Sequence, residues 1–262
     1  NQREYKIFQV DAFTDTLFKG NPACVVPLKK WLPDGLLLKI AKENAVAETA
    51  YFIEHKNHFH LRWFTPDIEM DLCGHATLAA AHIIKSELNS ADEIKFKTLS
   101  GDLSVHCKED LYYLNLPSRK PLNAELPNEI KLALNIQPNF ILKSRDYLLV
   151  YNNEQEIKAL KIDRSSFDKI NLGHGGVIAT AKGNDVDFVS RFFTPQATIL
   201  EDPVTGSAHC SLIPYWANIL SKNKLIASQY SQRGGTLYCE DKGGRVLVAG
   251  KAITYSKGLF RI

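Results

Sequence analysis

The sequence predicts an α+β fold made of two similar halves. Three observations support this prediction: the chain repeats itself, short strands are dense in both halves, and each half offers one long apolar helix. The repeat is anchored by Arg62-Trp63-Phe64-Thr65-Pro66 and Arg191-Phe192-Phe193-Thr194-Pro195, which lie 129 residues apart in a chain of 262. A doubly wound parallel sheet would alternate helix and strand throughout, so that class is excluded.

The repeat extends into a pair of turns that precede the two long helices. At the offset of 129 residues, Cys73 falls opposite Asp202. Three additional residues then change the offset to 132, which aligns Gly74-His75-Ala76 with Gly206-Ser207-Ala208. We therefore expect two homologous domains, residues 1–117 and 118–262, with the option that the C-terminal strand crosses back to the first half.

Short apolar or alternating segments predict the strands, and longer apolar patterns predict the helices. The strands expected in the first half are Tyr5–Phe13, Tyr51–Ile53, His58–Phe64, Ile94–Leu99 and Leu111–Leu116. Those expected in the second half are Tyr147–Tyr151, Val177–Ala181, Val186–Phe193, Thr236–Cys239 and Val246–Ala249. The expected helices are Asp34–Glu43, Gly74–Leu88, Asn128–Leu134 and Ala208–Leu220.

Composition narrows the class of protein. The chain is 45% hydrophobic with a formal net charge of +3, and no basic run exceeds two residues, which argues against nucleic acid or a charged membrane surface as the partner. No apolar stretch approaches the roughly 20 residues of a membrane span. Five widely spaced cysteines without a CxxC motif argue against a disulfide framework or a structural zinc site. We expect a cytoplasmic protein with reduced thiols.

The two turns carry the candidate chemistry. Asp71–Thr77 and Glu201–His209 each place a glycine just ahead of a helix start. Free backbone N–H groups and the positive end of the helix dipole favour an anion there. Small residues that merely cap a helix would give the same local pattern. The pairing of the two turns by the repeat favours a carboxylate site, in a cleft between the domains.

Four motifs in order resemble the phenazine biosynthesis PhzF family over nearly the whole chain. They are Phe8-Gln9-Val10-Asp11-Ala12-Phe13-Thr14 with Gly20-Asn21-Pro22-Ala23, then Ala47-Glu48-Thr49-Ala50, the Asp71–Thr77 turn, and Glu201-Asp202-Pro203-Val204-Thr205-Gly206-Ser207-Ala208. The resemblance implies the diaminopimelate epimerase-like fold, in which each half wraps a sheet around a central helix. It also implies a homodimer and cofactor-free isomerisation, which in the characterised family members acts on the cyclohexadiene amino acid trans-2,3-dihydro-3-hydroxyanthranilate.

The resemblance also assigns site residues. It implies that Glu48 is the proton-shuttling glutamate and that His75 and Asp202 are the other catalytic residues. Gly74 and Ser207 match positions that contact the ligand. With their neighbours around the two helix starts, the expected substrate-binding set is Cys73, Gly74, Ala76, Gly206, Ser207 and Ala208.

The residues themselves favour proton transfer by Glu48. It lies in the mostly apolar stretch 45–53, and removing a carboxylate from water raises its pKa toward the range where it can both take and return a proton. A solvated glutamate at a strand end is the alternative. Asp202 precedes Pro203, which forces it into an extended conformation, and we assign it to orienting the substrate or His75.

Three other interpretations stay open. A racemase or epimerase would use Cys73 with Asp202 as an unequal pair of bases, whereas a small buried cysteine would have no catalytic role. A non-catalytic protein that binds a small molecule is the third. We expect no metal and no cofactor, because the spacing of His75 with His82 and of His209 with Cys210 fits a metal site poorly and no nucleotide-binding glycine motif is present. The predicted substrate is a small unsaturated (amino) carboxylate.

Overall fold

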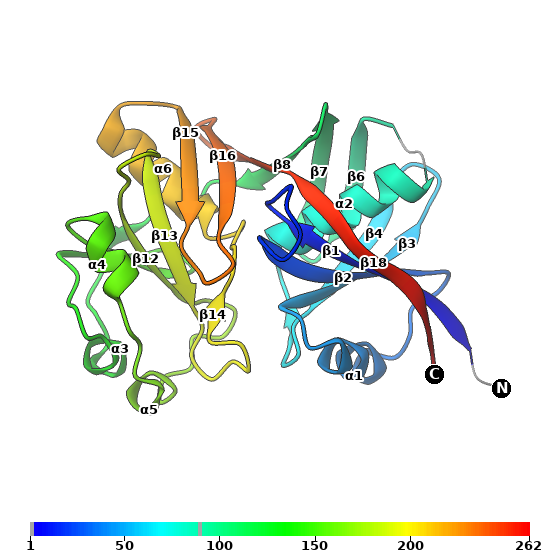
Figure 1. The fold of residues 1–262 in the computed structure, drawn as a ribbon, viewed down its shortest axis with the longest axis horizontal. Helices are drawn as coiled ribbons and strands as arrows, with labels where there is room; N and C mark the ends of the chain where they lie inside the picture. Colours follow the sequence, from blue (N-terminus) through cyan, green and yellow to red (C-terminus); the bar gives the residue numbers. More distant parts are fainter. Residues whose placement is uncertain (1–2, 89–90) are drawn as a thin grey trace. The chain divides into compact units, whose positions relative to one another are not determined.

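The computed structural model describes residues 3–88 and 91–262, and the chain divides into two compact units. The first unit comprises Asn1–Asn115 and Ala249–Ile262, and the second comprises Leu116–Val248. Each unit combines a mixed sheet with a few helices (Figure 1). The predicted α+β class is confirmed.

The sheet of the first unit runs in the order β18, β1, β2, β3, β4, β6, β7, β8. Two of these pairings, β2 with β3 and β4 with β6, are parallel, and the others are antiparallel. The strands are β1 (Glu4–Ala12), β2 (Asn21–Leu28), β3 (Glu48–Glu54), β4 (Phe59–Phe64), β5 (Glu69–Met70), β6 (Glu93–Thr98), β7 (Gly101–Lys108), β8 (Leu111–Pro117) and β18 (Ala252–Arg261). The helices are α1 (Asp34–Asn44) and α2 (Gly74–Leu88).

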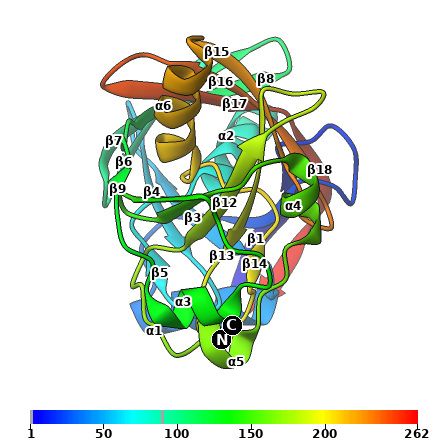
Figure 2. The ribbon, with the colours of Figure 1, turned by 90° about the vertical axis from the view of Figure 1, so that its left-hand side faces the viewer.

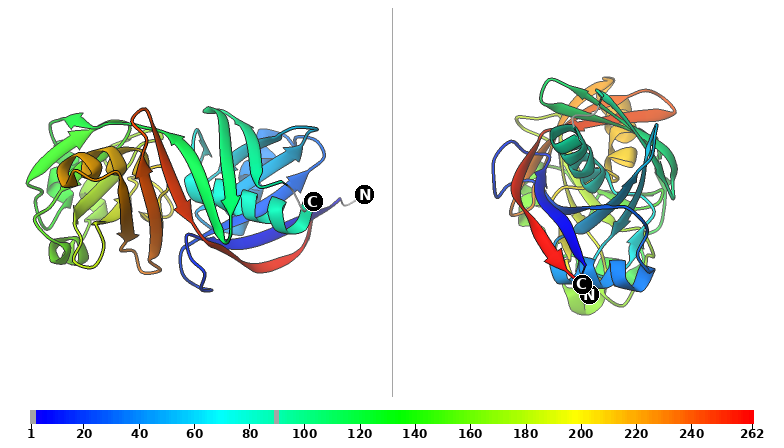
Figure 3. Two further views of the ribbon diagram at one scale, coloured as in Figure 1. Left: turned by 90° about the horizontal axis from the view of Figure 1, so that it is seen from above. Right: turned by 90° about the vertical axis from the view of Figure 1, so that its right-hand side faces the viewer.

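Helix α2 is the centre of the first unit. Its first eight residues, from Gly74 to Ala81, are all buried. A helix without a polar face must be covered on every side. Accordingly, α2 contacts β1, β2, β3 and β18, and strands surround it in two views (Figure 3). The helix start is therefore held inside the unit, together with any side chain that it carries.

The second unit repeats this plan. Its sheet runs β9, β10, β11, β12, β13, β15, β16, with the pairs β11–β12 and β13–β15 parallel. The strands are β9 (Leu122–Asn123), β10 (Phe140–Lys143), β11 (Tyr147–Val150), β12 (Val177–Lys182), β13 (Phe188–Phe193), β14 (Glu201–Asp202), β15 (Lys224–Gln229), β16 (Gly235–Asp241) and β17 (Arg245–Gly250). The helices are α3 (Asn128–Ala133), α4 (Glu154–Ala159), α5 (Arg164–Phe167) and α6 (His209–Leu220). Helix α4 contacts β12 and β13 (Figure 2), and the mostly buried α6 contacts β15 and β16.

The structure corrects the predicted register of the repeat. Arg62 forms a two-pronged ion pair with Glu69, and Arg191 forms the same pair with Glu201, at nearly identical distances of 2.7–2.9 Å. The three additional residues of the second half therefore lie before Glu201, in the loop that follows β13. Asp202 is then equivalent to Met70, and the prediction that it falls opposite Cys73 is wrong.

Among the described residues, no helix is both long enough and apolar enough to cross a membrane.

Candidate active site

Three candidate residues come together where β3 and α2 begin. Glu48 begins β3, where it pairs in register with Ala23 of the parallel strand β2. Cys73 immediately precedes α2, and His75 is the second residue of that helix. All three residues are buried, with Glu48 8% exposed and His75 2% exposed. The fold of a single unit thus brings together residues that lie 25 to 27 positions apart in sequence.

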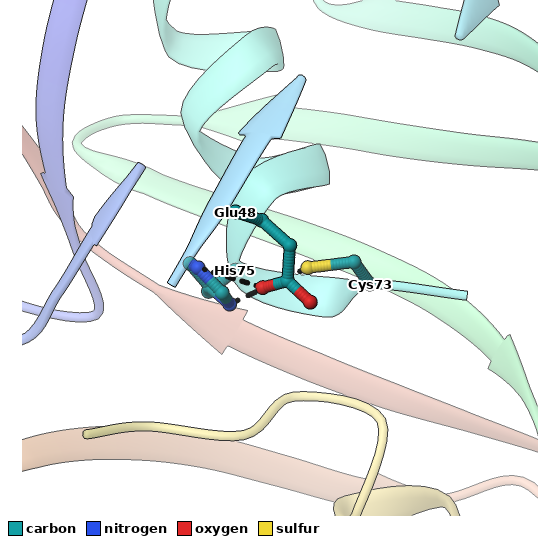
Figure 4. Close-up of side chains that lie close together, drawn as sticks. All are labelled: Glu48, Cys73 and His75. Atoms are coloured by element: carbon teal, nitrogen blue, oxygen red, sulfur yellow. Dashed lines mark hydrogen bonds and ion pairs between the residues drawn. The ribbon is translucent and has the colours of Figure 1, made fainter. Parts of the chain in front are cut away.

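Histidine 75 lies between the carboxyl group and the thiol. Its Nε2 atom is 3.2 Å from Oε2 of Glu48, and its Nδ1 atom is 3.4 Å from Sγ of Cys73 (Figure 4). The contact with Glu48 is close, but its angle falls short of an aligned hydrogen bond. Hydrogen bonds of catalytic pairs are often long or poorly aligned when no ligand is bound.

Burial determines the charge of this histidine. Desolvation lowers the pKa of His75 to about 3, so the imidazole is neutral near pH 7. A neutral imidazole carries one N–H and one lone pair. With the proton on Nε2, the ring donates toward Glu48 and accepts from the thiol of Cys73 through Nδ1. The group can therefore hold a carboxylate in place without neutralising its charge.

The start of α2 also presents backbone donors. The first N–H groups of a helix, here from Gly74 to Ala76, have no partner within the helix. Thr77 is the first residue to bond back, since both its N–H and its Oγ1 donate to the carbonyl of Cys73, at 3.2 and 2.6 Å. The positive end of the helix dipole favours a carboxylate at these donors.

In the second unit, Asp202 belongs to a tight polar network. Its Oδ2 accepts a 2.6 Å hydrogen bond from Oγ1 of Thr205. Buried Gln229 closes the turn, because its Nε2 donates to the carbonyl of Asp202 and to Oγ1 of Thr205, while its Oε1 accepts from N–H of Thr205. The turn is therefore fixed in one conformation by the end of β15.

Ser207 is oriented by a residue that the sequence did not single out. Nη2 of Arg145 donates to its Oγ at 3.0 Å. A guanidinium group can only donate, so the hydroxyl oxygen is the acceptor and its own proton points elsewhere. That arrangement leaves the hydroxyl proton of Ser207 able to donate to an anionic ligand. Gly206 and Ala208 flank it, and Ala208 lies directly before α6.

The structure thus brings Glu48, Cys73 and His75 together in the first unit, and it places Asp202, Gly206, Ser207 and Ala208 on one turn of the second. Sequence reasoning missed Arg145 and Gln229. Neither lies in a motif, and each acts only through the fold that brings it to the turn. No pattern in the chain could have indicated them.

The residue pairs that were considered as metal ligands from their spacing, His75 with His82 and His209 with Cys210, make other contacts. Both ring nitrogens of His82 are engaged, with the hydroxyls of Tyr112 and Thr254 at 2.9 Å. His209 donates from Nδ1 to the carbonyl of Thr205, and burial raises the pKa of Cys210 to about 11. Instead, Glu48, Cys73 and His75 form the one group of three possible ligands in the described part of the chain.

Comparison with known proteins assigns the family. Residues 10–258 match the family model described as phenazine biosynthesis-like protein. The chain belongs to this family. It is 45% identical to an uncharacterized isomerase of Pseudomonas aeruginosa, over 99% of this chain and 100% of the relative. It is also 36% identical to the phenazine biosynthesis-like domain-containing protein of Homo sapiens, over 96% of this chain and 97% of that one.

Solved structures agree with this assignment. A PhzF family protein from Enterococcus faecalis has a TM-score of 0.92 and 42% sequence identity, with 99% of this chain and 100% of that chain covered. A hydroxyproline epimerase from Agrobacterium vitis shares only the fold, with a TM-score of 0.67 and 10% identity, over 99% of this chain and 93% of that one. The predictions of the diaminopimelate epimerase-like fold and of an enzyme of the isomerase class are confirmed.

Proposed function

We propose that this isomerase moves a proton on a small unsaturated (amino) carboxylate without a cofactor, with Glu48 as the acid and base. The observation that carries the proposal is the placement of the Glu48 carboxyl group beside the neutral ring of His75, at the start of a buried helix. If the backbone donors at the helix start hold the substrate, a buried carboxyl group there can accept a proton from one of its carbon atoms.

The reaction conserves all atoms. Glu48 removes a proton from an activated carbon as the C–H bond breaks, and the electron pair moves along the conjugated system. The protonated carboxyl group then returns the proton to another carbon, forming a new C–H bond and shifting the double bond. No oxidant or reductant is needed. One residue performs both transfers, because a carboxyl group can serve as base and then as acid.

His75 supports this step as a neutral group. Its low pKa keeps it from taking the proton that Glu48 must return. An N–H directed at Glu48 holds the carboxylate in the productive orientation, and small movements let the same ring donate to the substrate. Preorganised neutral donors of this kind stabilise developing charge without moving a proton.

The backbone N–H groups from Gly74 to Ala76 bind the substrate carboxylate in this proposal. The repeat in the sequence predicts that the second turn, Gly206 to Ala208, binds the same substrate. The hydroxyl of Ser207, oriented by Arg145, supports that role. Asp202 keeps the role of orienting the substrate. It does not serve as the counterpart of Cys73.

A racemase or epimerase is the second candidate. The observation that favours it is the thiol of Cys73, 3.4 Å from Nδ1 of His75. In that mechanism Cys73 would be one of two bases on opposite faces of a stereocentre, and Asp202 would be the other. The third interpretation, a non-catalytic protein that binds a small molecule, disagrees with the isomerase class established above.

The test is a screen of small cyclic and acyclic unsaturated amino acids in deuterated water. Deuterium in a recovered compound identifies the substrate class and shows that a C–H bond is broken and remade. The wild-type protein should catalyse exchange and Glu48→Gln should not. Exchange that survives in Glu48→Gln would contradict the proposal. We further propose a homodimer in the cytoplasm, as the resemblance implies, and light scattering tests its mass.

A further inference from the structure

Three metal-ligating groups meet at the start of α2. Glu48, Cys73 and His75 each offer one ligand atom, and these atoms all lie within 4.8 Å of one another. Carboxylate oxygen, thiolate sulfur and imidazole nitrogen are the three kinds of ligand that proteins use for zinc. Figure 4 shows the three side chains directed toward one another, Glu48 from β3, Cys73 from the residue before α2, and His75 from the first turn of α2.

We infer that Glu48, Cys73 and His75 bind a single zinc-like divalent ion. In a tetrahedral site with zinc bonds of about 2.3 Å to sulfur and 2.1 Å to nitrogen, the two ligand atoms are about 3.6 Å apart. Sγ of Cys73 and Nδ1 of His75 are 3.4 Å apart, so this pair already has the required separation. Oε2 of Glu48 lies 3.2 Å from Nε2, the ring nitrogen that this ion would not use, so the carboxylate must rotate away from Nε2 to complete the set.

Charge balance favours the ion in this buried place. When the ion binds, the S–H bond of Cys73 breaks, its proton passes to solvent, and a metal–sulfur bond forms. The thiolate and the carboxylate of Glu48 then carry two negative charges against the two positive charges of the ion, while His75 adds a neutral ligand. A cluster with no net charge is far less costly to bury than an isolated ion.

The ligand set also defines the class of ion. Sulfur and imidazole nitrogen suit zinc, cobalt and cadmium, whereas magnesium and calcium prefer oxygen ligands. Three protein ligands leave a fourth position for water. The side chain of Glu48 keeps 11% of its surface exposed, which gives the ion a route to the other two groups. All three ligands belong to one unit, so the site is complete within it.

An occupied site would inhibit the proposed reaction, because the ion would hold the carboxylate that must take the proton. Binding itself does not rest on the proposed function and is measured without substrate. If cobalt binds and Glu48→Gln still exchanges deuterium, the inference stands and the proposed function fails. If cobalt does not bind and Glu48→Gln is inactive, the proposed function stands and the inferred metal site fails.

The experiment is a titration of the reduced, metal-free protein with Co²⁺, followed by absorbance. We expect a saturable thiolate-to-cobalt charge-transfer band at about one equivalent, with release of about one proton per ion. Cys73→Ser should lose the band, and Glu48→Gln and His75→Gln should each bind at least about tenfold more weakly. Zinc should displace the cobalt and remove the band, and excess magnesium should not.

Cys107→Ser is the matched control, because Cys107 is a buried cysteine of the same unit that lies on β7, outside the cluster. It should keep the wild-type band. Circular dichroism and thermal unfolding establish that each variant is folded, and Cys73→Ala provides a second test if the serine variant is unstable. A band that persists without the Cys73 thiol, unchanged affinity in Glu48→Gln, or no saturable binding by the wild type would overturn the inference.

Discussion

Thr205 occupies the position in the second unit that Cys73 occupies in the first. The carbonyl of Cys73 accepts a hydrogen bond from Oγ1 of Thr77, four residues on, and the carbonyl of Thr205 accepts one from Nδ1 of His209, also four residues on. Both residues precede a glycine that leads into the central helix of the unit. The repeat therefore supplies one thiol and one hydroxyl, and a symmetric two-thiol mechanism has no second thiol.

Replacement of Cys73 by serine separates the two enzymatic mechanisms. If Glu48 carries the proton, turnover in Cys73→Ser should fall less than about tenfold, or about 1.4 kcal/mol in barrier height. If Cys73 is one of two bases, the loss should be far larger, because serine supplies no comparable base near neutral pH. Deuterium exchange and product stereochemistry are measured for Cys73→Ser and Asp202→Asn side by side. Collapse of exchange in the serine variant, with Glu48→Gln active, would establish the epimerase mechanism.

Glu48→Gln should keep the fold and lose proton exchange by several orders of magnitude. The amide is nearly isosteric with the carboxyl group but has no usable base. Glu54→Gln is the matched control, since Glu54 lies at the other, exposed end of the same strand. It should exchange at the wild-type rate. Equal loss in both variants would point to an effect on β3 rather than on the chemistry.

In protein purified without divalent ions, prolonged treatment with a chelator, or dialysis against cofactor-free buffer, should leave activity unchanged. The proposed reaction requires only side chains and backbone donors, and the ion inferred above inhibits and does not assist. Activity is measured before and after treatment, with and without added divalent ions. Loss of activity that one particular ion restores would show that the site at Glu48, Cys73 and His75 is catalytic in its metal-bound form.

Acid should destabilise the protein through His209. This residue is fully buried, its Nε2 has no hydrogen-bond partner, and burial lowers its pKa to about 4. In the unfolded chain the pKa of this histidine is about 6.5. Between about pH 6.5 and pH 4, His209 is therefore protonated in the unfolded chain and neutral in the folded protein. The free energy of unfolding therefore falls as pH drops below about 6.5, by about 1 kcal/mol per pH unit for this group.

Urea unfolding at several pH values between about 7 and 5 measures this effect. His209→Gln should show a weaker pH dependence than the wild type, and His106→Gln, at an exposed position, should show the wild-type dependence. Part of the dependence should remain in His209→Gln, because burial also lowers the pKa of His75. Parallel curves for wild type and His209→Gln would refute the assignment.

Two glycines should respond to alanine in opposite directions. Gly20 has φ of +64°, and a Cβ there would lie 2.1 Å from the carbonyl oxygen of Ala12, so Gly20→Ala should cost at least about 2 kcal/mol. Gly35 lies in α1 with no atom near a new Cβ, and Gly35→Ala should stabilise the protein by about 0.5–1 kcal/mol. Thermal and urea unfolding give both values, and the same sign for both would contradict the argument.

The sequence predicted the helices around which each unit is built, because α2 and α6 are apolar on most sides. It missed β2, since Pro22 and Pro27 argue against a strand. The structure accepts Pro27 because it lies beyond Val25, the last residue that pairs with β1. It named no residues for β18, which are mostly exposed and show no alternation, although it allowed a C-terminal strand that crosses back to the first half.

Part of the candidate site could likewise be predicted from the sequence, and part could not. Glu48, Cys73 and His75 lie in motifs that could be read directly, and their geometry follows from β3 and α2. The alignment of the second turn, Glu201 to Ala208, with the first turn could not be predicted. The loop between Pro195 and Leu200 has no matching residues that would show where the three additional residues enter. Only the equivalent pairs of Arg62 with Glu69 and of Arg191 with Glu201 locate them.

The pairing of β1 with β18 has a consequence for synthesis on the ribosome. These strands are aligned from Glu4 with Arg261 to Ala12 with Ala252, and they lie side by side in Figures 1 and 3. The second unit is contiguous in sequence, whereas in the first unit β1 pairs with β2 early in the chain but gains its second neighbour only with β18. The first unit, with Glu48 and His75, therefore cannot complete its sheet until residues 252–261 have been synthesised, whereas every strand of the second unit is made before them.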